Sequence, residues 1–125
     1  MPHEFSRAER IAEAIHRDLA PLLQTIAQDN ALGLLSIAGV EVTPDLRFAR
    51  VYVSQLGASS GRERMMQVLE EEVGRCRRHL ARGLRLRYVP RLVFSYDDSA
   101  ERAAHLTELL RKPEQPGRRA PRRGR

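Results

Sequence analysis

The chain has 125 residues, a formal net charge of +6 and 42% hydrophobic residues. This length suits one domain with a modest core and disfavours a second independent core. Cys76 is the single cysteine, which excludes an internal disulfide and a cysteine-cluster metal site and is typical of a reducing compartment. The sequence has neither an apolar signal core nor an apolar run near the roughly 20 residues that span a bilayer. We therefore expect a cytoplasmic protein with no membrane segment.

The positive charge is unevenly distributed along the chain. Residues 112–125 hold one lysine, five arginines and one glutamate, a net charge of +5 out of the total of +6. Prolines, glycines and like charges without a large apolar residue predict a disordered basic tail there. Residues 1–111 are nearly balanced, with acids at 70–72 and 97–98 on either side of an arginine-rich stretch at 74–91. We expect a folded domain with one positive and one negative face.

A long helix is expected near the N-terminus. Ser6 and Glu9 fit the S-x-x-E capping box, which marks a helix start. Apolar residues then recur at helical spacing to about Gln28, at Ile11, Ile15, Leu19, Leu22, Leu23 and Ile26. Pro21 lacks the amide that would bond back along the helix, so we expect either a kink or two abutting segments.

Two strands are expected next, over residues 34–43 and 46–55. The turn at 43–45 is too short for anything but an antiparallel pair. Gly39 interrupts the alternation of the first strand and indicates a bulge. In the second strand small aliphatic residues should face the helices, leaving Phe48, Arg50 and Tyr52 on the other face. Such a face either stacks bases or is covered by another element.

The arginine-rich stretch from Gly74 to Arg91 carries seven arginines and no acidic residue. A helix beginning at about Arg62 should precede it, with a kink or turn at Gly74 because glycine weakens a helix. In the following helix one face would hold Cys76, Leu80 and Leu84, and the opposite stripe would hold Arg75, Arg78, Arg82 and Arg85. That stripe is either a phosphate-binding face or a solvated surface. A third strand over 91–97 and a last helix over 99–110 complete the expected domain.

Motifs for enzymatic chemistry are absent from the sequence. It contains no glycine-rich phosphate loop, no G-x-S-x-G and no H-E-x-x-H. The acids at 70–72 are helical neighbours that do not share one face, so a solvated patch is favoured over a cation site. We expect no catalytic residue, no metal site and no cofactor.

Several further motifs follow one another between residue 4 and about residue 111. They are Glu4–Arg7, Gly33–Leu35, Gly39–Leu46, Ala49–Val53 and Leu84–Ser99. Their residues and their order closely resemble those of the bacterial ribosome-binding factor A family. The resemblance implies an α+β fold over residues 1–111: a type II KH-like domain in the order helix, strand, strand, helix, kink, helix, strand, with a three-stranded mixed sheet packed on the helices.

The resemblance also bears on the kink between the two helices. In this family the nucleotide-clamping loop of KH domains is replaced by a kink of pattern A-x-G. The matching residues here are Glu72, Val73 and Gly74, so the glycine is kept and the alanine is replaced by glutamate. Either Glu72 turns outward or the geometry of the kink is relaxed.

The function that the resemblance implies is that of a non-enzymatic factor that binds the free, immature small (30S) ribosomal subunit and its 16S rRNA. Such a factor assists late rRNA processing and subunit maturation, notably in the cold. A ribosome-associated GTPase that releases it is a candidate further partner, and we expect a monomer. The expected RNA-binding residues are the stripe of Arg75, Arg78, Arg82 and Arg85, its extension Arg87 and Arg91, and as secondary candidates Arg7, Arg10 and Arg50.

A second function from another class remains open at this point. The acidic residues and the uncovered sheet face would dock a protein partner in a protein-interaction module, and RNA contact would then be incidental. Salt dependence separates the two functions, because arginine–phosphate contacts weaken steeply as salt rises.

Overall fold

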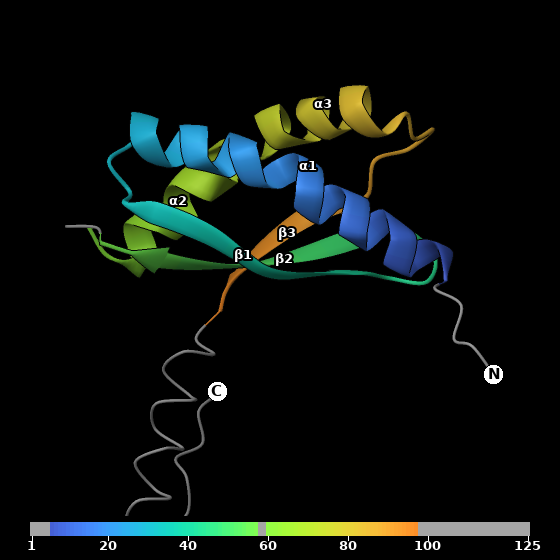
Figure 1. Ribbon diagram of the computed structural model, residues 1–125, viewed down its shortest axis with the longest axis horizontal. Coiled ribbons are helices and arrows are strands. Elements are labelled where there is room, and N and C mark those ends of the chain that lie inside the picture. Colours follow the sequence, from blue (N-terminus) through green and yellow to red (C-terminus); the bar gives the residue numbers. More distant parts are fainter. Residues whose placement is uncertain (1–5, 58–59, 98–125) are drawn as a thin grey trace, which may run out of the picture.

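The computed structural model of the chain describes residues 6–57 and 60–97, in which three helices lie on one face of a three-stranded sheet (Figure 1). In chain order the elements are α1 (Arg7–Asp29), β1 (Leu34–Val42), β2 (Phe48–Leu56), α2 (Arg62–Glu71), α3 (Val73–Leu84) and β3 (Arg91–Tyr96). The expected α+β class and element order are confirmed. The helix expected over 99–110 and the basic tail over 112–125 lie outside the described residues.

Helix α1 begins at the expected capping box and continues through Pro21 as one helix of 23 residues. The Ser6 hydroxyl accepts a hydrogen bond from the Glu9 amide at 3.1 Å, and the Glu9 carboxylate accepts one from the Ser6 amide at 2.8 Å. The expectation of two abutting segments is therefore wrong. Pro21 is exposed, while apolar residues on both sides of it are buried, so packing along the whole buried face offsets the missing amide bond.

Removal of the cap is expected to weaken the domain without unfolding it. Ser6→Ala removes the acceptor for the Glu9 amide, and we expect a loss of about 1 kcal/mol in the free energy of unfolding. Urea denaturation followed by circular dichroism measures this loss. Ser36→Ala is the matched control because Ser36 is exposed on β1, and the prediction is wrong if the two variants are equally stable.

The sheet has the order β1-β2-β3 and is mixed. β1 and β2 pair antiparallel, with a register shift between Ile37 and Gly39 that confirms the expected bulge. β2 and β3 pair parallel, so that Phe48 lies opposite Arg91. The core lies between the sheet and the helices and contains Leu35, Ile37, Ala49, Val51, Val53, Leu92 and Phe94 from the strands.

The other face of the sheet is uncovered by any element within residues 6–57 and 60–97 (Figure 1). The alternation expected for β2 is confirmed, since Phe48 is exposed and Ala49, Val51 and Val53 are fully buried. Two hydrogen bonds tie strands together across this face. Arg50 donates to the Ser95 hydroxyl at 2.9 Å, and the Tyr52 hydroxyl donates to the Glu41 carboxylate at 3.0 Å.

Helix α3 is fixed against α1 and the core. Leu80 and Cys76 are fully buried, as their spacing predicts. The His79 ring nitrogen lies 2.9 Å from the backbone oxygen of Asp18, which joins α3 to α1. Gly83 lies against the Asp18 side chain, which would have to shift if a side-chain carbon were added at this position. The opposite side of α3 is therefore held facing outward.

The Cys76 thiol is expected to be inert in the folded protein. Burial raises its pKa to about 11, and the nearby Glu72 carboxylate contributes to the rise. At pH 8 a thiol with this pKa has about two orders of magnitude less thiolate than an ordinary cysteine with a pKa of about 8.5. Reaction with a disulfide reagent at pH 8 should be at least that much slower in buffer than in denaturing urea. Equal rates in the two solvents would contradict the burial of this thiol.

Candidate nucleic-acid interface

The outward side of α3 carries three of the expected arginines, which we call the α3 arginine face: Arg75, Arg78 and Arg82. Arg78 and Arg82 are exposed, whereas Arg75 is half-buried and lies 3.6 Å from the Glu72 carboxylate. The fourth member of the expected stripe does not belong to it. Helix α3 ends at Leu84, and Arg85 adopts a left-handed conformation with φ 54°, so its side chain leaves the helical repeat.

The break between α2 and α3 lies two residues before the expected glycine. Glu72 alone separates the helices, with φ −97° and ψ 7°, whereas Val73 and Gly74 already belong to α3. A side-chain carbon at Gly74 would lie 3.4 Å from the Arg78 guanidinium. This is an ordinary van der Waals distance, so the Arg78 side chain lies over the first turn of α3 without requiring a glycine there. The Glu72 carboxylate is next to Arg75, so a cation partly offsets its negative charge.

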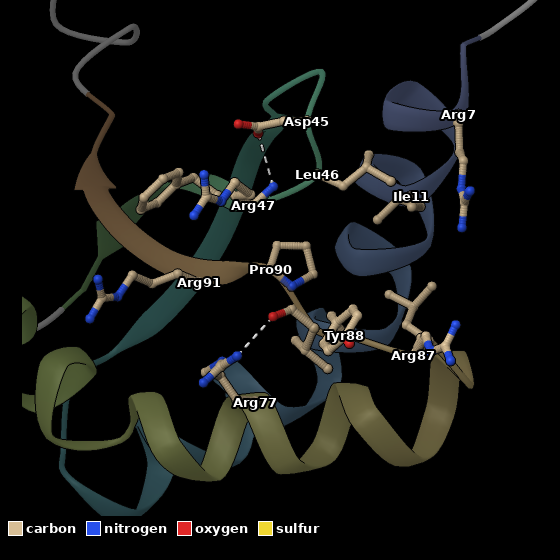
Figure 2. Close-up of a pocket in the computed structure, with 13 residues that line it drawn as sticks. Arg7, Ile11, Asp45, Leu46, Arg47, Arg77, Arg87, Tyr88, Pro90 and Arg91 are labelled. Atoms are coloured by element: carbon tan, nitrogen blue, oxygen red, sulfur yellow. Dashed lines mark hydrogen bonds between the residues drawn. The ribbon is translucent and has the colours of Figure 1, made fainter.

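A larger basic feature lies at the other end of α3, and we call it the arginine groove (Figure 2). It has a volume of about 770 Å³. Its lining residues are Arg7 and Ile11 of α1, Asp45, Leu46, Arg47 and Phe48 of the β1–β2 turn and the start of β2, Arg77 of α3, and Leu86, Arg87, Tyr88, Val89, Pro90 and Arg91 of the α3–β3 segment.

The arginines of the groove come from different elements and surround an apolar floor. Figure 2 shows Pro90 in the centre, Arg47 and Arg91 on one side, and Arg7 and Arg87 on the other. The parallel pairing of β2 with β3 brings the first two together, because the Arg91 amide donates to the Arg47 carbonyl at 2.8 Å. A concave surface with apolar walls and several guanidinium groups suits a ligand that has both phosphates and flat rings.

Asp45 is the one carboxylate among the described residues that line the arginine groove. It accepts hydrogen bonds from the Thr43 hydroxyl at 2.7 Å and the Arg47 amide at 3.1 Å. These two bonds hold the pKa of Asp45 below its usual value. The carboxylate is thus ionised and stabilises the β1–β2 turn. Five arginines and one aspartate line the groove, which leaves a net charge of +4.

The expected RNA-binding residues fall into separate places. Arg7, Arg87 and Arg91 line the arginine groove, while Arg75, Arg78 and Arg82 form the α3 arginine face. A second, smaller hollow joins the two surfaces, because Arg78 and Arg87 both line it. Arg10 is exposed on α1, Arg50 bonds to Ser95 on the uncovered sheet face, and Arg85 lies just beyond α3.

Two groove arginines, Arg47 and Arg77, are missing from the set that the sequence indicates. Arg77 lies off the stripe defined by Arg75 and Arg78, so helical spacing passes over it. Its guanidinium donates to the Val89 carbonyl at 2.7 Å and ties α3 to the segment before β3. Arg47 lies at the end of the β1–β2 turn, and it is the parallel pairing of β2 with β3 that makes Arg91 its neighbour. If the sequence had predicted that β3 lies beside β2, it would also have predicted Arg47 as a groove residue next to Arg91.

No helix within the described residues is long and apolar enough to cross a membrane. In that same part of the chain, no three histidine, cysteine, aspartate or glutamate side chains gather as metal ligands would.

Proteins of known sequence and structure resemble this chain over most of its length. The family model for ribosome-binding factor A matches residues 7–110. Ribosome-binding factor A of Thioalkalivibrio sulfidiphilus is 41% identical over 112 residues, which cover 90% of this chain and 87% of that protein. The crystal structure of ribosome-binding factor A from Thermus thermophilus is 28% identical, with a TM-score of 0.63, and the match covers 73% of this chain and 97% of that chain.

A second Thermus structure is similar. It is a homology model of the Thermus thermophilus factor fitted into a cryo-electron-microscopy map of that factor's complex with 30S, and it is 28% identical with a TM-score of 0.59. The match covers 70% of this chain and 92% of that one. The family model, the curated relative and both structures agree, and this chain belongs to the ribosome-binding factor A family.

Proposed function

We propose that this protein is a non-enzymatic assembly factor of the cytoplasm that binds the free, immature small ribosomal subunit through its 16S rRNA. It assists late rRNA processing and subunit maturation, including in the cold. Membership of the ribosome-binding factor A family supports this function. The Thermus relative fitted into a map of its 30S complex supports the small subunit as the partner.

The observation that carries the proposal is the arginine groove. Five arginines from distant parts of the sequence line one concave surface with an apolar floor, and the one carboxylate among the described lining residues is hydrogen-bonded within its own turn. Guanidinium groups bind phosphate oxygens with paired, charge-assisted hydrogen bonds. The α3 arginine face continues this positive surface through the smaller hollow that contains Arg78.

Phosphate contacts fix where a protein sits on RNA, but they do not read its sequence. Recognition of a folded rRNA site then depends on the spacing of the arginines, which the packing of α3, β2 and β3 determines. Such a factor needs neither a catalytic group nor a cofactor. A ribosome-associated GTPase would act on the complex to release it, and the factor itself would bind as a monomer.

Sedimentation of the tagged protein through a sucrose gradient of cell lysate tests the proposal. We expect it with free small subunits and not with translating ribosomes. A position at the top of the gradient, or an equal distribution over all ribosomal fractions, would contradict the proposed function.

A protein-interaction module is the second candidate, and the uncovered sheet face favours it. Leu34 and Leu56 are 54% and 65% exposed on that face, and Val93 is also exposed. Glu70 and Glu71 add exposed negative charge on α2. Binding to naked rRNA that weakens linearly with the logarithm of salt concentration supports the first function, whereas salt-insensitive binding to a protein supports the second.

A further inference from the structure

Tyr88 is the most exposed large hydrophobic side chain of the described residues, at 79%. It follows the end of α3 and lies between Arg77 and Arg87 in the arginine groove (Figure 2). An aromatic ring of this size gains nothing for folding from such a position, because little of its surface leaves water. The ring is therefore free to contact a ligand.

The backbone on both sides of Tyr88 is anchored. Next to it, the Val89 carbonyl accepts the 2.7 Å hydrogen bond from Arg77, and Pro90 is buried. On its other side Leu86 packs against the core. The ring is thus presented from a segment fixed at three points, which lowers the entropy cost of placing a ligand against it.

Tyr88 also stands between two hollows. It lines the arginine groove and the smaller hollow of about 380 Å³, whose other lining residues are Arg77, Arg78, Ala81, Arg87 and Val89. Arg77 and Arg87 line both hollows as well. An exposed ring that lines two hollows together with two arginines is accessible to a ligand that occupies either of them.

We propose that Tyr88 is a stacking platform for an unpaired RNA base, and that Arg77 and Arg87 hold the phosphates on either side of that base. This inference rests on the RNA binding of the proposed function. The positive charge of the two hollows disfavours an apolar peptide as the occupant. The exposed ring favours a single strand of RNA over a duplex. Bases in a duplex are already stacked on each other, whereas an unpaired base offers its face to an aromatic side chain.

The test uses the full-length protein and a short single-stranded RNA of mixed sequence with one 2-aminopurine base, whose fluorescence falls on stacking. A fully paired duplex of the same sequence is the second probe. We expect Tyr88→Leu to weaken binding of the single strand by about 5- to 150-fold and to abolish the quenching of 2-aminopurine. Binding of the duplex should change less than twofold, roughly, because that complex relies on phosphate contacts.

Two other variants test whether any loss of binding is due to the aromatic ring at position 88. Tyr88→Phe keeps the aromatic ring and should retain both the affinity of the wild-type protein and the quenching of 2-aminopurine. Tyr52→Leu is the matched control, because the hydroxyl of Tyr52 is bonded to Glu41 and its ring is half-buried on the sheet face. Urea denaturation confirms that each variant is folded, which the exposure of Tyr88 leads us to expect.

The possible results bear differently on the two proposals. If the wild-type protein binds neither probe, the stacking platform fails, and the proposed function is decided separately by sedimentation with small subunits. If it binds both probes but Tyr88→Leu leaves affinity and quenching unchanged, the platform is wrong and RNA binding stands. Loss with Tyr88→Phe equal to that with Tyr88→Leu, or loss with Tyr52→Leu instead, also overturns the platform.

Discussion

Reversal of charge at Arg78 and Arg82 is expected to remove the protein from free small ribosomal subunits. Each of the two arginines is exposed on α3, so the change to glutamate leaves the core intact. R78E/R82E replaces two phosphate-binding groups with two that repel phosphate, and we expect affinity to fall on the order of 100-fold or more. Cosedimentation with purified small subunits measures the loss directly.

Salt dependence gives the same prediction a second, independent readout. Loss of two phosphate contacts should make the slope of log affinity against log salt shallower by about 1.4 to 1.8. Arg64→Glu on α2 is the control, because Arg64 is also exposed and its reversal makes half the change in charge of R78E/R82E away from α3. Unchanged cosedimentation of R78E/R82E, or an equal loss with Arg64→Glu, would show that the α3 arginine face does not bind the subunit.

The second large effect is expected for stability. Leu80 is fully buried and belongs to the core cluster that joins α3 to the sheet and α1. Leu80→Ala removes apolar contacts and leaves a cavity, so the free energy of unfolding should fall by about 2 to 5 kcal/mol. This is a large part of the roughly 5 to 15 kcal/mol that stabilises a typical domain. The midpoint of urea denaturation is the measurement.

The control for this variant removes the same atoms from a different environment. Leu56 is 65% exposed at the end of β2, and Leu56→Ala should cost less than about 0.5 kcal/mol. If the two variants lose equal stability, Leu80 does not anchor α3 as described. Such a result would also weaken the interpretation of the outward arginine face, because the buried side of α3 determines which side faces solvent.

Sequence patterns predict the elements of this fold well where one face is buried. The capping box of α1 corresponds to observed structure because its two hydrogen bonds join residues three apart, and the period-2 pattern of β2 does so because alternate side chains of a strand point to opposite faces of the sheet. Pro21 shows the limit of local reasoning. Its cost to the helix is local, but the burial that offsets it comes from contacts with residues far along the chain.

The candidate site was less predictable than the fold. Helical spacing correctly indicates the outward position of Arg78 and Arg82, but it extends the stripe to Arg85, where the helix has already ended. Arg47 and Arg91 are neighbours only through the parallel pairing of β2 with β3. No pattern within either strand specifies which strand lies beside it, so the arginine groove could not be assembled from the sequence.

That same parallel pairing couples the binding surface to the completion of folding. Residues that line the arginine groove range from Arg7 to Arg91, and β3 must dock beside β2 before Arg91 reaches Arg47. In a chain with only α1 and the β1–β2 hairpin formed, Arg91 would not yet be placed beside Arg47. A ligand of the groove would accordingly select the fully folded chain over partly folded forms, and by mass action it would raise the melting temperature of the domain as its concentration increases.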